Sequence, residues 1–209
     1  VHDRVLHDVM QRPRGYLECP VLQIRGPVVA ALLERVLNEI AARHEIWRTA
    51  FVLEDDPAQV IGRSARIPLR LHDRRSPGIP PGERRQELET IAEALASQPF
   101  VLSRAPLVRC ALVTFTDDEH ALLMMMHHLV TDAWSEHLIA AELARLYGFL
   151  AAGEPLPPRS EIETQYGDHA AWQRSDDARD DSRAFLRRVF GSPPAPLSLP
   201  RTVGDAPTA

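Results

Sequence analysis

The chain has 209 residues, of which 44% are hydrophobic and 25% are charged, and its net charge at pH 7 is −5. These values are ordinary for a soluble globular protein that forms its own hydrophobic core. The 24 basic residues are mixed with 29 acidic ones, which argues against nucleic acid or an anionic membrane as a partner. All basic residues are arginines, which indicates a GC-rich bacterial genome and excludes a catalytic lysine or a P-loop.

The sequence contains no apolar run as long as a membrane span and no apolar signal core at its start, so we predict a cytoplasmic protein. Cys19 and Cys110 lie far apart without the spacing of metal ligands. They are interpreted as two small buried hydrophobic residues in a reducing compartment, not as a disulfide.

The first two expected elements are a strand and a helix. Residues 16–24 alternate and are rich in strand formers, and a Gly-Pro pair ends them. Residues 28–44 carry apolar side chains at a period near 3.6, which predicts a helix packed on a sheet. Glu34, Arg35 and Glu39 are expected on the face of this helix that points to water.

Three short strands and a second helix follow in the pattern. Residues 49–54 and 59–62 predict two strands around a polar turn, in a hairpin-like arrangement, and residues 67–72 predict another strand. After a loop rich in proline, glycine and charge, residues 83–97 predict a helix with its apolar face on the core.

The strongest strand prediction is a long antiparallel hairpin. Residues 106–116 and 119–128 are both rich in strand formers, and Asp117 and Asp118 separate them. The second of these strands is continuously apolar, so it should be central in the sheet and covered on both faces. Its three methionines are interpreted as core residues.

The last third of the sequence predicts helices and then a tail. Residues 133–152 predict a long helix, and residues 163–173 and 176–190 predict two more. Residues 192–209 are rich in proline without periodicity and are interpreted as a linker. The expected fold class is therefore α/β (α+β), with one mixed, largely antiparallel sheet covered by helices.

The residues most suited to chemistry lie where the central strand meets the long helix, and residues 124–135 read MMMHHLVTDAWS. Successive strand residues point to opposite faces, so one of His127 and His128 should face a cleft and the other the core. A neutral imidazole can accept a proton from an amine or hydroxyl that attacks a carbonyl. No serine or cysteine elbow is present, so the acyl group would pass directly to its acceptor.

The same geometry argues against a metal site, because the two histidines do not converge and no further ligand has suitable spacing. No metal is therefore expected.

Asp132 lies at the turn into the helix, where a carboxylate can cap the first amides, and this structural role is at least as well supported as a catalytic one.

Four ordered segments resemble the condensation domains of nonribosomal peptide synthetases. The His-His-x-x-x-Asp-Gly motif of that family is matched by residues 127–133, apart from Ala133 in place of glycine. Its Arg-His-Glu-x-x-Arg-Thr-x-Phe segment resembles residues 43–51, and its Pro-Phe and Pro-Leu-x-Arg block resembles residues 99–109. Its Gln-Tyr-x-Asp-x-x-x-Trp-Gln segment is similar to residues 165–173. The N-terminal motif of the family is absent or degenerate.

The resemblance implies a single lobe similar to chloramphenicol acetyltransferase, one of two lobes that normally form a V-shaped pair around a tunnel. Residues 1–191 would form the N-terminal lobe, and residues 192–209 would be the Pro-rich linker toward a missing C-terminal lobe. Such a lobe would join an acyl or peptidyl thioester and an aminoacyl thioester only when paired with the C-terminal lobe, and the isolated lobe would be inactive. The implied partners are carrier proteins, whose phosphopantetheine arms are substrates, and no directly bound cofactor is implied.

The resemblance also implies roles for individual residues. His128 matches the histidine associated with catalysis, as a base or by positioning the amine, whereas His127 and Asp132 match structural positions. Arg48 and Arg109 match arginines that make bracing ion pairs. Ala133 is acceptable in the first turn of a helix, so its methyl group would matter only by crowding the tunnel.

Two other readings remain open. A different acyltransferase with a His-x-x-x-Asp motif could use the same base to deprotonate a hydroxyl and form esters. A noncatalytic lobe could serve as a docking or structural module, as Ala133 and the missing second lobe suggest.

Overall fold

The computed structural model describes residues 16–52, 57–75, 78–159 and 162–191. The chain divides into two compact units, Val1–Gly167 and Asp168–Ala209. The first unit holds the sheet and the helices that cover it, and the second holds the last helices. The linker predicted over residues 192–209 lies outside the described residues, so the domain boundary drawn at residue 191 stays a prediction.

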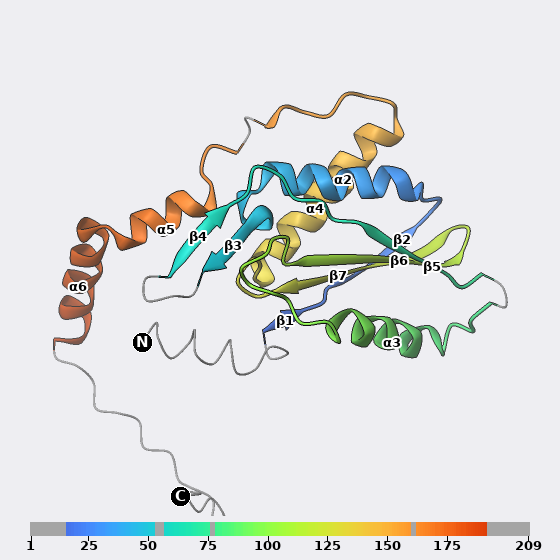
Figure 1. The fold of residues 1–209 in the computed structure, drawn as a ribbon, viewed down its shortest axis with the longest axis horizontal. Coiled ribbons are helices and arrows are strands. Elements are labelled where there is room, and N and C mark those ends of the chain that lie inside the picture. Colours follow the sequence, from blue (N-terminus) through green and yellow to red (C-terminus); the bar gives the residue numbers. More distant parts are fainter. Residues whose placement is uncertain (1–15, 53–56, 76–77, 160–161, 192–209) are drawn as a thin grey trace, which may run out of the picture. The chain divides into compact units, whose positions relative to one another are not determined.

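The main sheet is mixed and largely antiparallel, as the sequence predicts (Figure 1). Its order is β1-β7-β6-β5, and β2 also pairs with β7. Only the β5–β6 pairing is parallel. The five strands are β1 (Leu17–Glu18), β2 (Val21–Arg25), β5 (Leu69–Asp73), β6 (Val108–Thr116) and β7 (Glu119–His127).

The hairpin of β6 and β7 forms the centre of this sheet, and β7 has partners on both sides. Every residue of β7 after Glu119 is buried. Alternate residues of the strand belong to two different hydrophobic clusters, with Leu122, Met124 and Met126 on one face and Leu123 and Met125 on the other. The continuous apolar run thus reflects a strand covered on both sides, as predicted.

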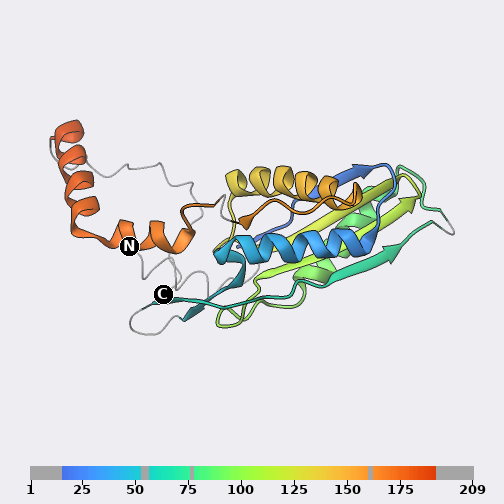
Figure 2. The ribbon, with the colours of Figure 1, turned by 90° about the horizontal axis from the view of Figure 1, so that it is seen from above.

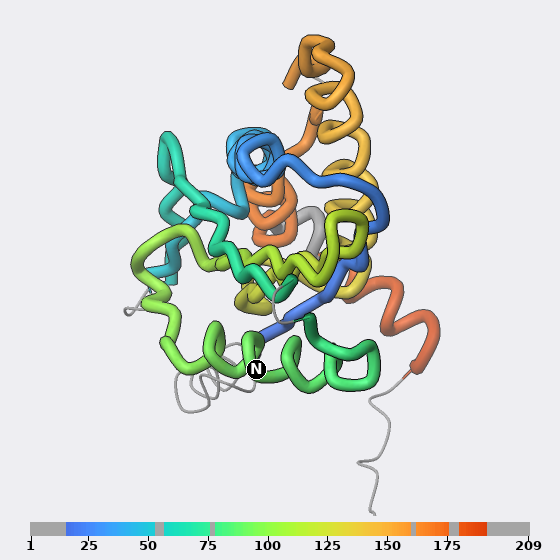
Figure 3. Tube along the Cα trace, turned by 90° about the vertical axis from the view of Figure 1, so that its right-hand side faces the viewer, coloured from blue at the N-terminus to red at the C-terminus, as the bar shows by residue number. Residues whose placement is uncertain are grey.

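Two helices cover one face of the sheet and one helix covers the other (Figures 2 and 3). Helix α2 (Ala30–Arg43) and helix α4 (Ala133–Ala151) share the larger cluster with β6 and β7. Helix α3 (Arg84–Ala96) supplies Ile91 and Leu95 to the smaller cluster. This arrangement fixes the direction in which α4 leaves the end of β7.

A second, two-stranded sheet follows α2. The short helix η1 (Glu45–Arg48) leads into β3 (Thr49–Val52), which pairs antiparallel with β4 (Ala58–Ile61). This confirms the hairpin-like arrangement predicted for the segment, and the tip of the turn lies partly outside the described residues.

The second unit and the end of the first contain α5 (Tyr166–Arg174) and α6 (Asp176–Phe190), close to the two helices predicted there. Across the described ranges, none of the helices combines the length and the apolar character that crossing a membrane requires.

Two details differ from the sequence predictions. The strand expected over residues 16–24 is interrupted at Pro20, which has no backbone N–H to donate and whose carbonyl accepts the N–H of Met124 at 3.1 Å.

Glu39 does not point to water, because Arg43 and Arg159 both pair with its carboxylate and leave only 11% of the side chain exposed. The partner Arg159 lies in a distant segment that folds back over α2, which no local pattern reveals.

Candidate functional site

The turn that follows β7 is held by backbone hydrogen bonds from two other segments. The His127 N–H donates to the Leu107 carbonyl at 3.1 Å, and the His128 N–H donates to the Tyr16 carbonyl at 2.8 Å. The short strand β1 runs antiparallel beside this end of β7, with Leu17 opposite His127 and Glu18 opposite Met126. The histidine pair is therefore mounted on rigid structure, and β1 lies at its edge.

His127 is a buried structural residue with 3% of its surface exposed. Its ring stacks on Tyr16 at a centroid distance of 6.5 Å and meets Phe100 edge-on at 6.4 Å. Its Nδ1 accepts the N–H of Leu129 at 3.2 Å, which closes the turn. Burial, and then the charge of His128, lower the pKa of His127, so the ring is suited to the neutral form.

His128 points to solvent, with 43% of its side chain exposed, as expected for the other member of the pair. Its Nδ1 lies 2.7 Å from the carbonyl oxygen of Thr131. A carbonyl can only accept, so Nδ1 must carry the hydrogen, and in the neutral ring Nε2 then presents a lone pair. Nε2 lies 3.7 Å from Oε1 of Glu18. The ring is therefore held in the tautomer that a general base requires.

Asp132 is the N-cap residue of α4. Its Oδ1 accepts both the backbone N–H and the hydroxyl of Ser135, each at 2.7 Å. The hydroxyl and then the N–H of Ser135 lower the pKa of this carboxylate. Ala133 is exposed and begins the helix, and no non-glycine residue in the described ranges has a positive φ. Alanine is therefore free of backbone strain at this position.

The two arginines act at different places. Arg48 donates to the Gly62 carbonyl at 2.7 Å and pairs with Glu45 at 3.2 Å, so it braces η1 against the end of β4. Arg109 lies beside the histidine turn, where its guanidinium carbon is 3.9 Å from the centroid of the Phe100 ring that meets His127.

The contacts of Arg109 differ from the expected ion pair. Its guanidinium donates to the carbonyls of Leu95, Gln98 and Pro99, at 3.0, 2.5 and 3.0 Å. These carbonyls lie at the end of α3 and just beyond it, where the last turn of a helix leaves carbonyl groups without helical partners. Arg109 thus stabilises the loop that carries Phe100, and it supports the motif through this ring instead of through a carboxylate.

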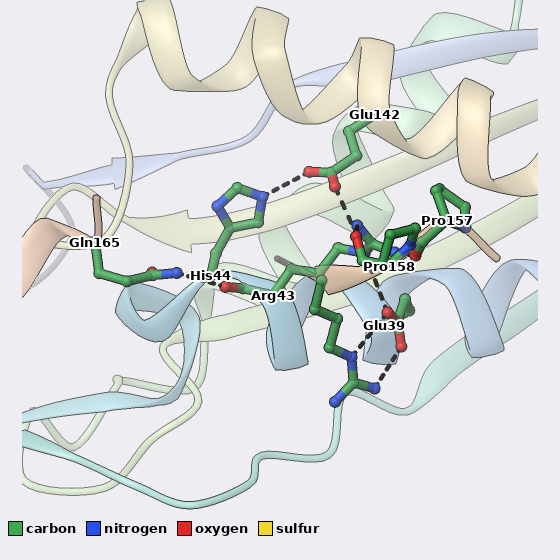
Figure 4. Close-up of polar contacts among 8 residues, drawn as sticks. Glu39, Arg43, His44, Glu142, Pro157, Pro158 and Gln165 are labelled. Atoms are coloured by element: carbon green, nitrogen blue, oxygen red, sulfur yellow. Dashed lines mark hydrogen bonds and ion pairs between the residues drawn. The ribbon is translucent and has the colours of Figure 1, made fainter. Parts of the chain in front are cut away.

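Sequence reasoning did not find the polar network that joins α2, α4 and the segment after α4 (Figure 4). The side chain of Arg43 is completely buried and lies 3.1 Å from a carboxylate oxygen of Glu39 and 3.8 Å from one of Glu142. Its guanidinium also donates to the carbonyls of Pro157 and Pro158. A buried arginine requires this number of partners, because an unpaired buried charge is costly.

His44 and Gln165 extend this network (Figure 4). Nε2 of His44 lies 2.6 Å from Oε2 of Glu142. The Gln165 amide donates to the Arg43 carbonyl at 2.9 Å and accepts the N–H of Glu45 at 3.0 Å. Gln165, the first residue of the segment 165–173, therefore contacts the segment 43–51, and both segments carry the family resemblance.

Within the described ranges, no group of three or more histidine, cysteine, aspartate or glutamate side chains is arranged to hold a metal ion. The site consists of one exposed imidazole with a defined tautomer, a capped helix beside it and a carboxylate on the neighbouring strand. This arrangement can accept a proton from a nucleophile that arrives at Nε2.

The family model for the condensation domain matches residues 4–208. The chain belongs to the condensation-domain family. Similar proteins include the malpibaldin synthetase of Mortierella alpina, which is 34% identical over 185 residues, or 86% of this chain and 3% of that protein. The phosphinothricin tripeptide synthetase PhsB of Streptomyces viridochromogenes is 35% identical over 197 residues, or 90% of this chain and 16% of the synthetase. The chain thus spans a small part of these relatives.

Solved condensation domains have the same fold. The first condensation domain of the calcium-dependent antibiotic synthetase CDA aligns with a TM-score of 0.70 and 24% identity, covering 95% of this chain and 51% of that one. The SgcC5 protein from Streptomyces globisporus aligns with a TM-score of 0.68 and 26% identity, covering 85% of this chain and 40% of the other. The fold is thus the expected one, similar to chloramphenicol acetyltransferase, and the chain spans about half of these structures or less.

Proposed function

We propose that this chain is the N-terminal lobe of a peptide synthetase condensation domain, which forms an amide bond when it is paired with its C-terminal lobe. The donor would be an acyl or peptidyl thioester on one carrier protein, and the acceptor an aminoacyl thioester on another. The observation that carries the proposal is the exposed His128, whose Nδ1–H is held by the Thr131 carbonyl so that Nε2 is free to act.

The proposed reaction needs only one base. The amine nitrogen attacks the thioester carbonyl carbon, the C–S bond breaks, and the pantetheine thiol leaves. His128 Nε2 accepts the proton that the amine loses and passes it to the departing sulfur, so no proton is left over. The backbone N–H groups of His128 and His127 donate to the Tyr16 and Leu107 carbonyls, and these bonds fix the backbone that carries the imidazole during this step.

The proposed partners are the carrier proteins, whose phosphopantetheine arms are substrates and not bound cofactors, and the C-terminal lobe. Support for a covering partner comes from the start of α4, where Trp134 and Leu138 are 76% and 58% exposed. These side chains lie one turn apart on the helix that Asp132 caps, next to His128. We infer that the isolated lobe is inactive, because the C-terminal lobe would form the other side of the substrate tunnel.

The experiment is a condensation assay with the parent protein, which contains both lobes, and with matched acyl and aminoacyl carrier proteins. His128→Ala should lower the rate of dipeptidyl-thioester formation by about 100-fold or more, the typical contribution of general base catalysis. His72→Ala is the matched control, because His72 is a partly exposed histidine on β5, level with Ala121 at the far end of β7 from the histidine turn. An unchanged rate for His128→Ala would refute the assignment, and transfer to hydroxyl acceptors alone would favour an ester-forming enzyme.

A further inference from the structure

A second hydrogen-bond acceptor lies near Nε2 of His128, and it belongs to none of the motifs that carry the family resemblance. Glu18 comes from β1, and its Oε1 lies 3.7 Å from His128 Nε2. The antiparallel register of β1 with β7 places Glu18 beside this end of the strand. The Tyr16 carbonyl, two residues earlier, holds the backbone of His128 itself. Glu18 is therefore fixed relative to the base by its own strand.

Both groups are open to an arriving substrate. The side chain of Glu18 is 44% exposed, and that of His128 is 43% exposed. Two acceptors that are 3.7 Å apart can both lie about 2.9 Å from a single nitrogen atom, which is an ordinary hydrogen-bond distance. One nucleophilic atom can thus donate to Nε2 and to the Glu18 carboxylate at the same time.

The number of hydrogens on the nucleophile decides whether this double contact forms. A neutral primary amine carries two hydrogens, so it can give one to His128 and donate the other to Glu18. A hydroxyl or a neutral secondary amine carries one hydrogen, which His128 must receive for the attack to proceed. The Glu18 carboxylate therefore stays without a partner when either of these acceptors reacts.

A second carboxylate increases the negative charge at this place. Glu136 lies in the first turn of α4, and its Oε1 is buried without a hydrogen-bond partner. Burial and then the negative charge of Glu18 raise the pKa of Glu136. A hydrogen bond donated by the neutral acceptor amine to Glu18 would offset part of this negative charge.

We propose that Glu18 is a specificity-determining residue, which contacts the acceptor nitrogen beside His128 and selects primary amines over secondary amines and hydroxyls. This inference rests on the proposed amide-forming function and names the acceptor class of the same site. Glu18 takes no proton permanently. It accepts one hydrogen bond while His128 receives the proton that is transferred.

The test compares three acceptors in the two-lobe parent protein. Aminoacyl, N-methylaminoacyl and hydroxyacyl thioesters with the same side chain are presented on one carrier protein, and kcat/KM is measured for each. Glu18→Gln keeps the shape of the side chain and removes its charge. It should lower kcat/KM for the primary amine about tenfold, the loss expected for one charge-assisted hydrogen bond, and change the other two less than about twofold.

The control is Glu93→Gln, which removes an exposed carboxylate from α3, the helix on the other face of the sheet, and should change none of the three values. Equal melting temperatures of the variants would show that Glu18→Gln folds normally. An equal loss for all three acceptors, or no loss for the primary amine, would overturn the inference while leaving the proposed function intact. Absence of amide formation by the unmodified protein would instead refute the proposed function, and the inference with it.

Discussion

At the end of β7, two adjacent histidines lie in different environments, because His127 is buried and His128 is exposed. His127 is enclosed by Tyr16 and Phe100, whereas His128 reaches solvent with one nitrogen fixed by a carbonyl. The alternation of side chains along a strand accounts for this division, and it was predicted from the sequence. Which nitrogen of His128 is free depends on the Thr131 carbonyl, which only the structure reveals.

Asp132 provides a prediction for a single residue. Asp132→Ala removes the acceptor for the Ser135 N–H and hydroxyl, so the free energy of unfolding should fall by about 1 kcal/mol. Asp132→Asn keeps an oxygen at the same place and should lose less stability. The measurement is urea denaturation of the three proteins at pH 7. If Asp132→Ala unfolds at the same urea concentration as the unchanged protein, the capping role is wrong.

At the scale of one element, α4 carries two carboxylates whose pKa values shift in opposite directions. Burial raises the pKa of Glu142, but the hydrogen bond and charge of His44 and the charges of Arg43 and Arg145 outweigh it, so the net shift is downward. The pKa of Glu136 is raised, chiefly by burial and by the charge of Glu18. A lowered carboxyl pKa stabilises the fold above the pKa of the unfolded chain, and a raised one destabilises it there.

The corresponding glutamine variants should therefore have opposite effects at pH 7. Glu142→Gln should lower the free energy of unfolding by about 1.5–3 kcal/mol, because it removes a charged hydrogen-bond partner of His44 and an ion-pair partner of Arg43. Glu136→Gln should raise it by roughly a few tenths of a kcal/mol, since one carboxylate oxygen is buried but the residue as a whole is partly exposed, and solvent screens part of its charge.

Both differences should disappear at low pH, where each carboxyl becomes neutral like glutamine in the folded and in the unfolded chain. For Glu142 the stabilisation is lost as the pH falls through its lowered folded pKa. For Glu136 the destabilisation is absent below the unfolded pKa and develops as the pH rises. Urea denaturation from pH 7 to pH 3 measures both, and effects of the same sign would contradict the assigned environments.

For the whole molecule, the sequence predicts elements whose periodicity reflects burial, and it fails where distant segments meet. The strand β7 and the helix α2 could be predicted because the apolar pattern of each reflects a face that is covered in the fold. The partners of Arg43 could not be predicted from local sequence patterns, because Pro157 and Pro158 lie more than 100 residues away along the chain. Glu18 was missed for the same reason, since its place beside His128 depends on the pairing of β1 with β7.

The two cysteines allow the stability of the whole sheet to be compared with that of its edge. Cys110 is fully buried in β6, the strand between β7 and β5, and burial and then Cys19 raise its pKa. Cys19 is partly buried between β1 and β2, and burial and then the charge of Glu136 raise its pKa to about 11. Only a thiolate reacts with a disulfide reagent, so both thiols should react much more slowly than free cysteine in the native protein.

The labelling rates of the two thiols should depend differently on urea, because the unfolding events that expose them differ in size. In Cys19→Ser, the remaining Cys110 should react only through global unfolding, so its rate should rise steeply with urea from the lowest concentrations. In Cys110→Ser, Cys19 should react faster and almost independently of urea at first, because detachment of β1 and β2 exposes little surface. Fast labelling of Cys110 without urea would contradict the central position of β6. Equal urea dependence of both thiols would show instead that β1, and with it Glu18, is held as firmly as the core.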